Sequence, residues 1–230
     1  TYGLKKLADF NVKILENQMR GMLLKIKENE IWTQLLGEFN AYNLLAVFAA
    51  SIILGLEELS ILKKISQLQS VPGRFQTFYT QNNIMIIIDY AHTPDALKKV
   101  LSSIDKIRTK NENLFTIIGC GGDRDKKKRP KMGEVAARYS SKVIFTSDNP
   151  RNEDPKLIIE EMISGVSPVD HKKISIIVKR DEAILSACKL SIPGDIVLIA
   201  GKGHENFQEI KGKKHPFNDY EYARKIFTKA

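Results

Sequence analysis

The stretch Leu114–Asp125 reads LFTIIGCGGDRD, a short apolar run followed at once by a glycine-rich, charged loop. Two other stretches have the same design: Lys142–Arg151 reads KVIFTSDNPR, and Ile196–Glu205 reads IVLIAGKGHE. In a parallel α/β sheet, the loops after the carboxyl ends of the strands gather along one edge, where ligands bind. We therefore expect these loops to share one pocket containing arginine, glutamate, asparagine and glycine. Such a set suits an amino acid, which carries both a carboxylate and an ammonium group.

Strand and helix patterns alternate regularly from Ile84 onward. Ile84–Ile88 is entirely apolar, as expected for a strand covered on both faces. Thr93 can cap the next helix, Pro94 suits its first position, and the charge of Asp95 favours its N-terminus. The other expected elements are helices from Pro130, over Asp154–Ser164, Asp181–Leu190 and Tyr220–Phe227, and strands at Leu114–Ile118, Val143–Thr146, Ile174–Val178 and Ile196–Ala200. Repeated strand–helix units predict an α/β fold with a doubly wound, mostly parallel sheet.

The first seventy residues have a different pattern. The first forty predict irregular strands with polar interruptions. A helix is expected from Asn40, as its N-cap, to Leu54, with Gly55 as the stop. A second helix is expected at about Glu57–Gln67, and the turn-forming residues Ser70–Arg74 end the pattern. We therefore predict a domain boundary that separates residues 1–72 from residues 73–230.

The composition indicates a globular, cytoplasmic protein. Of the 230 residues, 43% are hydrophobic, which is enough for a full core. The longest apolar stretch, Leu44–Leu56, falls short of the roughly 20 residues that cross a bilayer, so no membrane partner is expected. Cys120 and Cys188 are too few for a disulfide framework and lack metal-ligand spacing. The chain begins at Thr1 rather than Met, so we expect a fragment of a longer protein.

The formal net charge of +9 has three interpretations. Nucleic-acid binding is disfavoured, because the dense basic run Lys126–Arg129 has no neighbouring aromatic residue and no recognition motif is found. A polyanionic small substrate such as a nucleotide is the second interpretation. A lysine-rich background composition is the third. Charge alone does not choose between the last two.

Two familiar phosphate-binding motifs are absent. A dinucleotide fingerprint at Gly119–Gly122 requires a third glycine where Arg124 stands. A P-loop ending at Gly201-Lys202 fails because Ile196 replaces the first glycine and Gly203 replaces the serine or threonine. Phosphoryl chemistry therefore requires sequence outside this chain.

The second and third loops carry groups suited to an amino acid. Pro150 stiffens its turn, and the Asn149 amide both donates and accepts hydrogen bonds. Arg151 offers a planar fork for a carboxylate, and Glu205 offers a carboxylate for an ammonium group. The alternative is that Arg151 is a solvated residue in an ordinary turn. His204 taken alone is more typical of a structural than a catalytic histidine.

Taken together, these segments resemble the Mur ligase family. The matching stretches, in order, are residues 36–43 (LGEFNAYN), 72–75 (PGRF), 89–94 (DYAHTP), 119–130 (GCGGDRDKKKRP), 148–151 (DNPR) and 201–208 (GKGHENFQ). The resemblance implies three domains: one for a UDP-sugar, a central ATPase domain, and a Rossmann-like C-terminal domain. Residues 1–72 would end the central ATP-binding domain, and residues 73–230 would form the C-terminal domain, which binds the incoming amino acid.

The resemblance also implies an activity in peptidoglycan synthesis and cell-wall biogenesis. In the family, ATP phosphorylates the terminal carboxylate of a UDP-N-acetylmuramoyl peptide, and the amine of the incoming amino acid attacks the acyl phosphate. The P-loop and a modified lysine that helps hold Mg²⁺ lie in the part of the family's sequence that is missing here. We therefore expect no turnover by this chain alone and assign it no catalytic or metal-binding residue.

Residue by residue, the resemblance assigns two sets of binding positions. The amino-acid set is Arg124, Asp148, Asn149, Pro150, Arg151, Gly201 and Glu205, and the ATP set is Asn43, Arg74, Asp89 and His92. The Asp-Asn-Pro-Arg form is similar to that of members that add meso-diaminopimelate to UDP-N-acetylmuramoyl-L-alanyl-D-glutamate, because the distal carboxylate needs a cationic partner. Ser147 departs from the many relatives that have an aspartate there, which affects the expected geometry of the loop.

Other functions stay open. A related ligase could add L-lysine, ornithine or another diamino acid, or act like a folylpolyglutamate synthase. A nucleotide-binding module without enzymatic activity is the third possibility. Under each of these hypotheses we expect no nucleic-acid partner and no oligomer.

Overall fold

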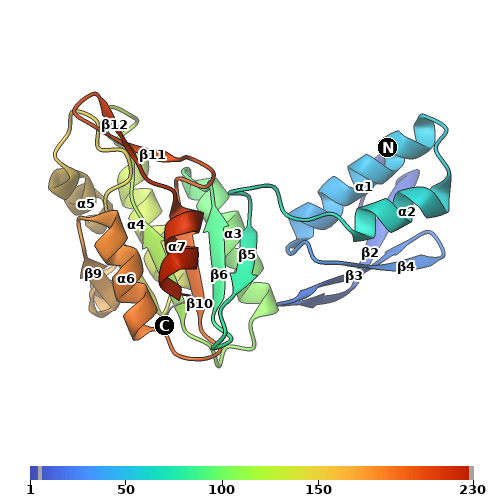
Figure 1. The fold of residues 1–230 in the computed structure, drawn as a ribbon, viewed down its shortest axis with the longest axis horizontal. Coiled ribbons are helices and arrows are strands. Elements are labelled where there is room, and N and C mark those ends of the chain that lie inside the picture. The colour runs from blue at the N-terminus through green and yellow to red at the C-terminus, as the bar shows by residue number, and fades with distance from the viewer. Residues whose placement is uncertain (5–6, 228–230) are drawn as a thin grey trace. The chain divides into compact units, whose positions relative to one another are not determined.

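The computed structural model describes residues 1–4 and 7–227, which form two compact units (Figure 1). The first comprises the described residues of Thr1–Ser70 together with Lys106–Arg108, and the second comprises Val71–Asp105 and the described residues from Thr109 onward. The division after Ser70 lies close to the boundary expected from the sequence. The assignment of these units to a central and a C-terminal ligase domain stays a prediction.

The first unit contains a four-stranded sheet in the order β1-β2-β3-β4. Its strands are β1 (Tyr2–Gly3), β2 (Phe10–Gln18), β3 (Gly21–Ile26) and β4 (Asn29–Thr33). The strands predicted here are present: β2 to β4 form an antiparallel run, to which β1 adds in parallel. A bulge between Ile14 and Glu16 is the one register shift recorded for β2 and β3. The alternation of buried and exposed residues along β4 places one face of the sheet against a core.

Helices α1 (Glu38–Ile53) and α2 (Glu58–Ser66) supply the other side of this core, in which Leu45 and Phe48 are completely buried. The predicted N-cap of α1 was wrong. Gly37 is the cap, with a φ of 90°, and Asn40 lies within the first turn, where its side-chain amide donates to the Leu36 carbonyl. An asparagine near a helix start can bond backward to a preceding carbonyl as well as cap, so its presence located this helix start only approximately.

The second unit contains a six-stranded sheet in the order β5-β6-β10-β7-β8-β9. Its strands are β5 (Gln76–Tyr79), β6 (Met85–Asp89), β7 (Leu114–Ile118), β8 (Lys142–Phe145), β9 (Ile174–Ile176) and β10 (Ile196–Ala200). All neighbouring pairs are parallel except β5 with β6. Every residue of β6, β7 and β10 is buried, because helices cover both faces. The predicted fold class, with a mostly parallel sheet, is confirmed.

Helices on the two faces of this sheet position its loops (Figure 1). They are α3 (Pro94–Ile107), α4 (Lys128–Tyr139), α5 (Pro155–Ile163), α6 (Arg180–Leu190) and α7 (Asp219–Phe227). Residues of α6 and α7, including Ile184 and Phe227, share a core cluster with Phe115 and Val197 of the sheet. Thr93 Oγ1 accepts from the Ala96 N–H at the start of α3, as predicted.

Several elements differ from the prediction. Helix α4 begins at Lys128, which places Pro130 at the third helical position, where a missing N–H is tolerated. Strand β9 ends at Ile176, and a 3₁₀ helix at Pro168–Lys173 precedes it. The sequence also gave no indication of edge strand β5.

The antiparallel hairpin of β11 (Phe207–Ile210) and β12 (Lys213–Pro216) was also missed. All four residues of β12 are exposed, so no alternation of apolar and polar residues marks it as a strand. Its two-residue turn is Lys211-Gly212, with φ values of 49° and 72°. No helix among residues 1–4 and 7–227 is long and apolar enough to cross a membrane.

Candidate substrate-binding site

The loops that follow β7, β8 and β10 lie side by side, because these strands are neighbours in the sheet. The Gly122 N–H donates to the Asn149 carbonyl at 2.9 Å, which joins the first loop to the second. The Asn149 side-chain amide donates to Glu205 Oε2 at 2.8 Å, which joins the second loop to the third. The predicted gathering of the three loops is therefore confirmed. The roles of their residues in binding stay predictions.

The Asn149 amide is the centre of this network, because it contacts Lys202, Glu205 and Glu209. Its Oδ1 accepts from Lys202 Nζ at 3.1 Å and from the Glu209 N–H at 2.9 Å. Its Nδ2 donates to Glu205. These partners distinguish the oxygen from the nitrogen and so determine which way the amide points. Asn149 thereby orients Glu205, and most of its hydrogen-bonding capacity is occupied within the protein.

Lys202, to which no role was assigned from the sequence, is a completely buried cation of the third loop that reaches Asn149 of the second. Its Nζ donates to Glu205 Oε2 at 2.8 Å as well as to Asn149. Partial burial would raise the pKa of Glu205, but the hydrogen bonds from Lys202 and Asn149 outweigh it and hold that pKa below its usual value. Glu205 is therefore a carboxylate at neutral pH, and both of these hydrogen bonds are made to its Oε2.

Asp148 and Gly201 meet beneath this network. Burial raises the pKa of Asp148, although the charges of Arg180 and Lys202 oppose it. Asp148 Oδ1 accepts from the Asn149 N–H at 2.7 Å. A Cβ at Gly201 would lie 2.8 Å from Asp148 Oδ2, and the φ of 110° there suits only glycine. Both residues therefore shape the loops from within.

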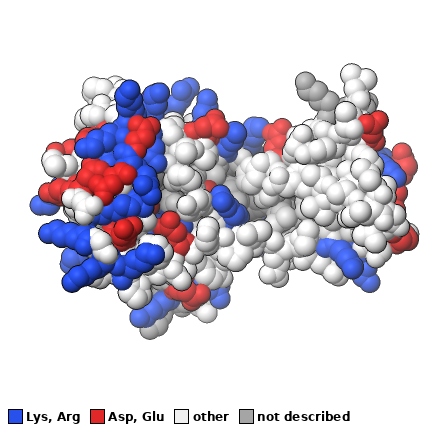
Figure 2. Space-filling view, turned by 90° about the horizontal axis from the view of Figure 1, so that it is seen from above, with Lys and Arg blue, Asp and Glu red and all other residues white. Residues whose placement is uncertain are grey.

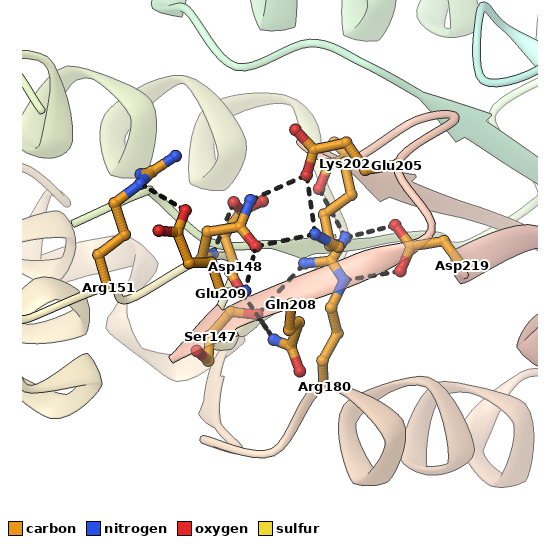
Figure 3. A network of polar contacts seen from close by, with 11 residues as sticks. Ser147, Asp148, Arg151, Arg180, Lys202, Glu205, Gln208, Glu209 and Asp219 are labelled. Carbon is orange, nitrogen blue, oxygen red and sulfur yellow. Dashed lines mark hydrogen bonds and ion pairs between the residues drawn. The ribbon is translucent and has the colours of Figure 1, made fainter. Parts of the chain in front are cut away.

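Arg180 and Asp219 form a second buried group next to the network (Figure 3). Arg180 Nε and Nη2 each donate to one Asp219 oxygen at 2.7 Å, the bidentate arrangement that arginine favours. Nη2 also donates to the Ala200 carbonyl at 3.0 Å, at the last residue of β10. This pair joins α6 and α7 to the strand that carries the third loop.

Arg151 lies on the side of the network opposite Arg180 (Figure 3). It has a φ of 50°, a conformation that non-glycine residues seldom adopt. Its Nη1 donates to the Gly122 carbonyl at 2.8 Å, and its Nε donates to Glu209 Oε2 at 3.0 Å. Arg151 is thus held by the first loop and by the hairpin and is not a freely solvated turn residue.

The first loop is anchored by Arg129, the last residue of the basic run. Arg129 is completely buried and donates to Glu153, Glu161 and the Gly121 carbonyl. Its hydrogen bonds lower the pKa of Glu153 to about 2. Arg124, by contrast, is exposed, and its guanidinium donates to the Asp123 carbonyl at 3.3 Å. Part of the basic run therefore stabilises the fold.

Two of the four expected ATP residues, Arg74 and His92, lie near the third loop. A Cβ at Gly73 would lie 2.1 Å from the His204 nitrogen, so the turn before Arg74 packs directly on this loop. The Arg74 guanidinium lies over the Tyr90 ring, 4.8 Å from its centroid, and His92 contacts the same ring.

The other two expected ATP residues have different surroundings. Burial raises the pKa of Asp89, whose two oxygens accept from the Phe75 and Ala91 N–H groups at 2.7 Å. Through these hydrogen bonds, Asp89 stabilises the turn that follows β6. Asn43 lies on α1 in the other unit, where its amide contacts Asn40 Oδ1 at 3.5 Å.

A cavity of about 650 Å³ lies against the second loop and the hairpin. Of the seven expected amino-acid residues, only Pro150 and Arg151 line it. Gln208 and Ile210 contribute to its wall, whereas Glu209, between them on the strand, does not. The expected pocket, with arginine, glutamate, asparagine and glycine from all three loops, is therefore not found at this cavity. Asp148, Asn149, Gly201 and Glu205 lie in or against the hydrogen-bond network around Asn149, whereas Arg124 is exposed on the first loop.

The positive charge is concentrated in the second unit. Val71–Asp105 and residues 109–230 contain 26 of the 36 Lys and Arg but 20 of the 27 Asp and Glu, which places +6 of the net +9 there. Figure 2 shows basic side chains crowded over part of this unit, with acidic ones between them. Such a surface favours anionic small molecules. Within residues 1–4 and 7–227, no group of three His, Cys, Asp or Glu is placed to hold a metal ion.

A comparison with protein families relates this geometry to known proteins. Residues 73–203, more than half of the chain, match the family described as Mur ligase, glutamate ligase domain. The chain belongs to the Mur ligase family. The six sequence motifs had indicated the same family.

Named relatives match this Mur ligase chain over nearly its whole length. Proteins from Cytophaga hutchinsonii and Bacteroides thetaiotaomicron, both named UDP-N-acetylmuramoyl-L-alanyl-D-glutamate–2,6-diaminopimelate ligase, are each 48% identical to it. The matches cover 95% and 99% of this chain and 45% and 47% of the relatives. The chain thus spans about half the length of the curated relatives it matches.

Solved structures agree with the fold of this Mur ligase chain. A structure of a ligase with the same name aligns with a TM-score of 0.73 at 37% identity, over 98% of this chain and 47% of that one. A folylpolyglutamate synthase from Thermotoga maritima aligns with a TM-score of 0.65 at 20% identity, over 84% of this chain and 44% of that one. The second likeness shows a shared fold alone.

Proposed function

We propose that this Mur ligase chain is the amino-acid-binding portion of an ATP-dependent amide ligase that adds meso-diaminopimelate to UDP-N-acetylmuramoyl-L-alanyl-D-glutamate. The observation that carries the proposal is the placement of Arg151 and Glu205, a cation and a carboxylate, on loops joined through Asn149. An amino-acid centre has the complementary pair of charges. The names of the relatives that match nearly all of this chain support the choice of substrates.

Each loop has a distinct part in this proposal. Arg151 binds the distal carboxylate of diaminopimelate through Nη2, since its Nε and Nη1 are engaged within the protein. Glu205 binds an ammonium group through Oε1. Exposed Arg124 supplies a cation for the other carboxylate. The remaining residues of the set, Asp148, Asn149, Pro150 and Gly201, hold these groups in position. Catalysis by such a site consists of orienting the amine towards the activated carboxylate.

The nucleotide side is proposed to use Arg74, His92 and Asn43, with Asp89 shaping the turn. Arg74 suits a phosphate because its exposed guanidinium rests on Tyr90. When bound, ATP supplies the phosphoryl group that activates the carboxylate of the UDP-linked dipeptide. By resemblance to the family, ATP and Mg²⁺ are held mainly by the part of the central domain that lies outside this chain.

The proposed organisation follows that of the family. Residues 1–72 end a central ATP-binding domain, and residues 73–230 form the domain that binds the amino acid. The ligase acts as a monomer in the cytoplasm, in peptidoglycan synthesis, with neither nucleic acid nor membrane as a partner. Addition of L-lysine or ornithine, or a folylpolyglutamate synthase activity, is the alternative. A requirement for the distal carboxylate of meso-diaminopimelate distinguishes the proposed function from these alternatives.

Substitution of Arg151 in the intact protein tests the proposal. With ATP and the UDP-linked dipeptide present, Arg151→Ala should lower kcat/KM for meso-diaminopimelate by at least roughly thirty-fold, because losing one such charged contact costs about 2–5 kcal/mol. Use of L-lysine should change little. Arg138→Ala, at an exposed position on α4, is the matched control.

Calorimetric titration of the intact protein gives an independent check. Selective binding of meso-diaminopimelate over L-lysine is expected. A preference for lysine would be consistent with the proposed ligase activity but would contradict the choice of meso-diaminopimelate as its substrate. Binding of neither, with ATP and the dipeptide present, would overturn the amino-acid site.

A further inference from the structure

The start of the hairpin runs alongside the loop that carries Arg151. The Arg151 N–H donates to the Glu209 carbonyl at 3.0 Å, and the Lys211 N–H donates to the Arg151 carbonyl at 2.8 Å. The Gln208 side-chain amide donates to the Asp148 carbonyl at 2.6 Å. The second loop is therefore paired with the hairpin as an added strand would be, and this pairing holds Arg151 in its left-handed conformation.

The side chains of Arg151 and Glu209 extend this pairing. Glu209 Oε2 accepts from Nε, and the Gly122 carbonyl accepts from Nη1. Among the described residues, no partner is recorded for Nη2, and the Arg151 side chain keeps 19% of its exposure. The guanidinium is therefore held at Nε and at Nη1, and Nη2, which shares with Nε the edge that faces Glu209, is the nitrogen left for a ligand.

Glu209 also changes the charge of this position. The isolated Arg151 guanidinium carries a full positive charge, whereas the partly buried Arg151–Glu209 pair is neutral overall. A ligand carboxylate that binds at Nη2 is attracted by Arg151 and repelled by Glu209. Orientation strengthens binding and repulsion weakens it, so the two effects of Glu209 oppose each other.

We propose that Glu209 is a specificity-determining residue of the amino-acid site, which orients Arg151 for a substrate carboxylate and moderates its affinity for that carboxylate. The inference rests on the proposed function. Glu209 acts through Arg151 and is a positioning residue.

Two substitutions in the intact protein separate its two effects. Glu209→Gln keeps an oxygen that accepts from Nε but removes the charge, so KM for meso-diaminopimelate should fall about two- to five-fold. Glu209→Ala removes the acceptor as well, so Arg151 loses its orientation and KM should rise roughly ten-fold. KM for L-lysine, and kcat with either substrate, should change less than about two-fold.

Controls and contrary outcomes complete the test. Glu134→Gln, at an exposed position on α4, should change neither constant. If Glu209→Ala fails to fold, Glu209→Asp replaces it and should also raise KM, because its shorter side chain does not reach Nε. If KM changes in the same direction in both Glu209 variants, or changes in neither variant, the inference is overturned. The proposed function is not affected by that outcome. A wild-type protein that does not use diaminopimelate overturns both the inference and the proposed function.

Discussion

Arg180 and Asp219, 39 residues apart in sequence, form an ion pair whose two side chains are completely buried. Removing one partner leaves an uncompensated charge in the core, so Asp219→Ala should destabilise its domain by about 3–5 kcal/mol. Urea unfolding of the intact protein, followed by a probe in this domain, measures the change. The double variant Arg180→Met/Asp219→Leu should recover much of the stability. A double variant as unstable as the single one would contradict this account.

The buried ammonium of Lys202 is expected to be essential for amino-acid binding. Lys202→Met removes the hydrogen bonds to Asn149 and Glu205, so KM for the amino acid should rise by roughly ten- to a hundred-fold. Lys213→Met, at an exposed position in the hairpin, is the matched control. Unchanged KM in Lys202→Met would show that Glu205 needs no buried partner.

The pH dependence of binding gives a separate prediction for the same pair. In the wild-type protein the lowered pKa of Glu205 keeps it ionised, and affinity for an ammonium group is lost as the pH falls through that pKa. Without Lys202 the pKa rises, so the loss should begin at a higher pH. A profile of KM against pH for wild type and Lys202→Met measures the shift. Overlapping profiles would contradict the role of Lys202.

The ion pair between Glu153 and Arg129 should make the stability of this domain depend on pH in the acidic range. The pKa of Glu153 in the folded protein is about 2, below its ordinary value of 4.5. Its contribution to stability is therefore complete above about pH 4.5 and is lost as the pH falls towards 2. Glu153→Gln should melt at a lower temperature at neutral pH and show a smaller fall in melting temperature below pH 4.5. Equal slopes for variant and wild type would contradict the prediction.

Alanine substitutions at Gly201 and Gly212 separate the effect of a steric clash from the effect of backbone strain. Gly201→Ala places a methyl group 2.8 Å from Asp148 Oδ2 in a left-handed conformation, and should weaken amino-acid binding as well as destabilise the loop by about 1–3 kcal/mol. Gly212→Ala introduces a similar strain at a φ of 72° but meets no atom within 4 Å. Only Gly201→Ala should impair binding measured by calorimetry.

The parallel sheet and its three site loops could be predicted because their signals are local. Runs such as Ile196–Ala200 are apolar throughout, and the helix after Thr93 starts with a cap and a proline. Position in a parallel sheet then brings the loops together without knowledge of any long-range contact.

The residues that support the site could not be predicted in the same way. Lys202 and Arg180 are charged residues, and the sequence does not reveal that their partners in the fold allow complete burial. Glu209 and Gln208 belong to a hairpin whose second strand is exposed along its whole length. Its pairing with the second loop depends on contacts about 60 positions apart.

The hairpin lies outside the six-stranded sheet, as a separate two-stranded element. Its residues can therefore vary without disturbing the packing of the core, while they adjust the loop that carries Arg151. If Glu209 sets substrate preference as proposed, that preference is separable from fold stability in this domain. A lineage could acquire a new preference by substitutions in Phe207–Pro216 and inherit the rest of the domain unchanged.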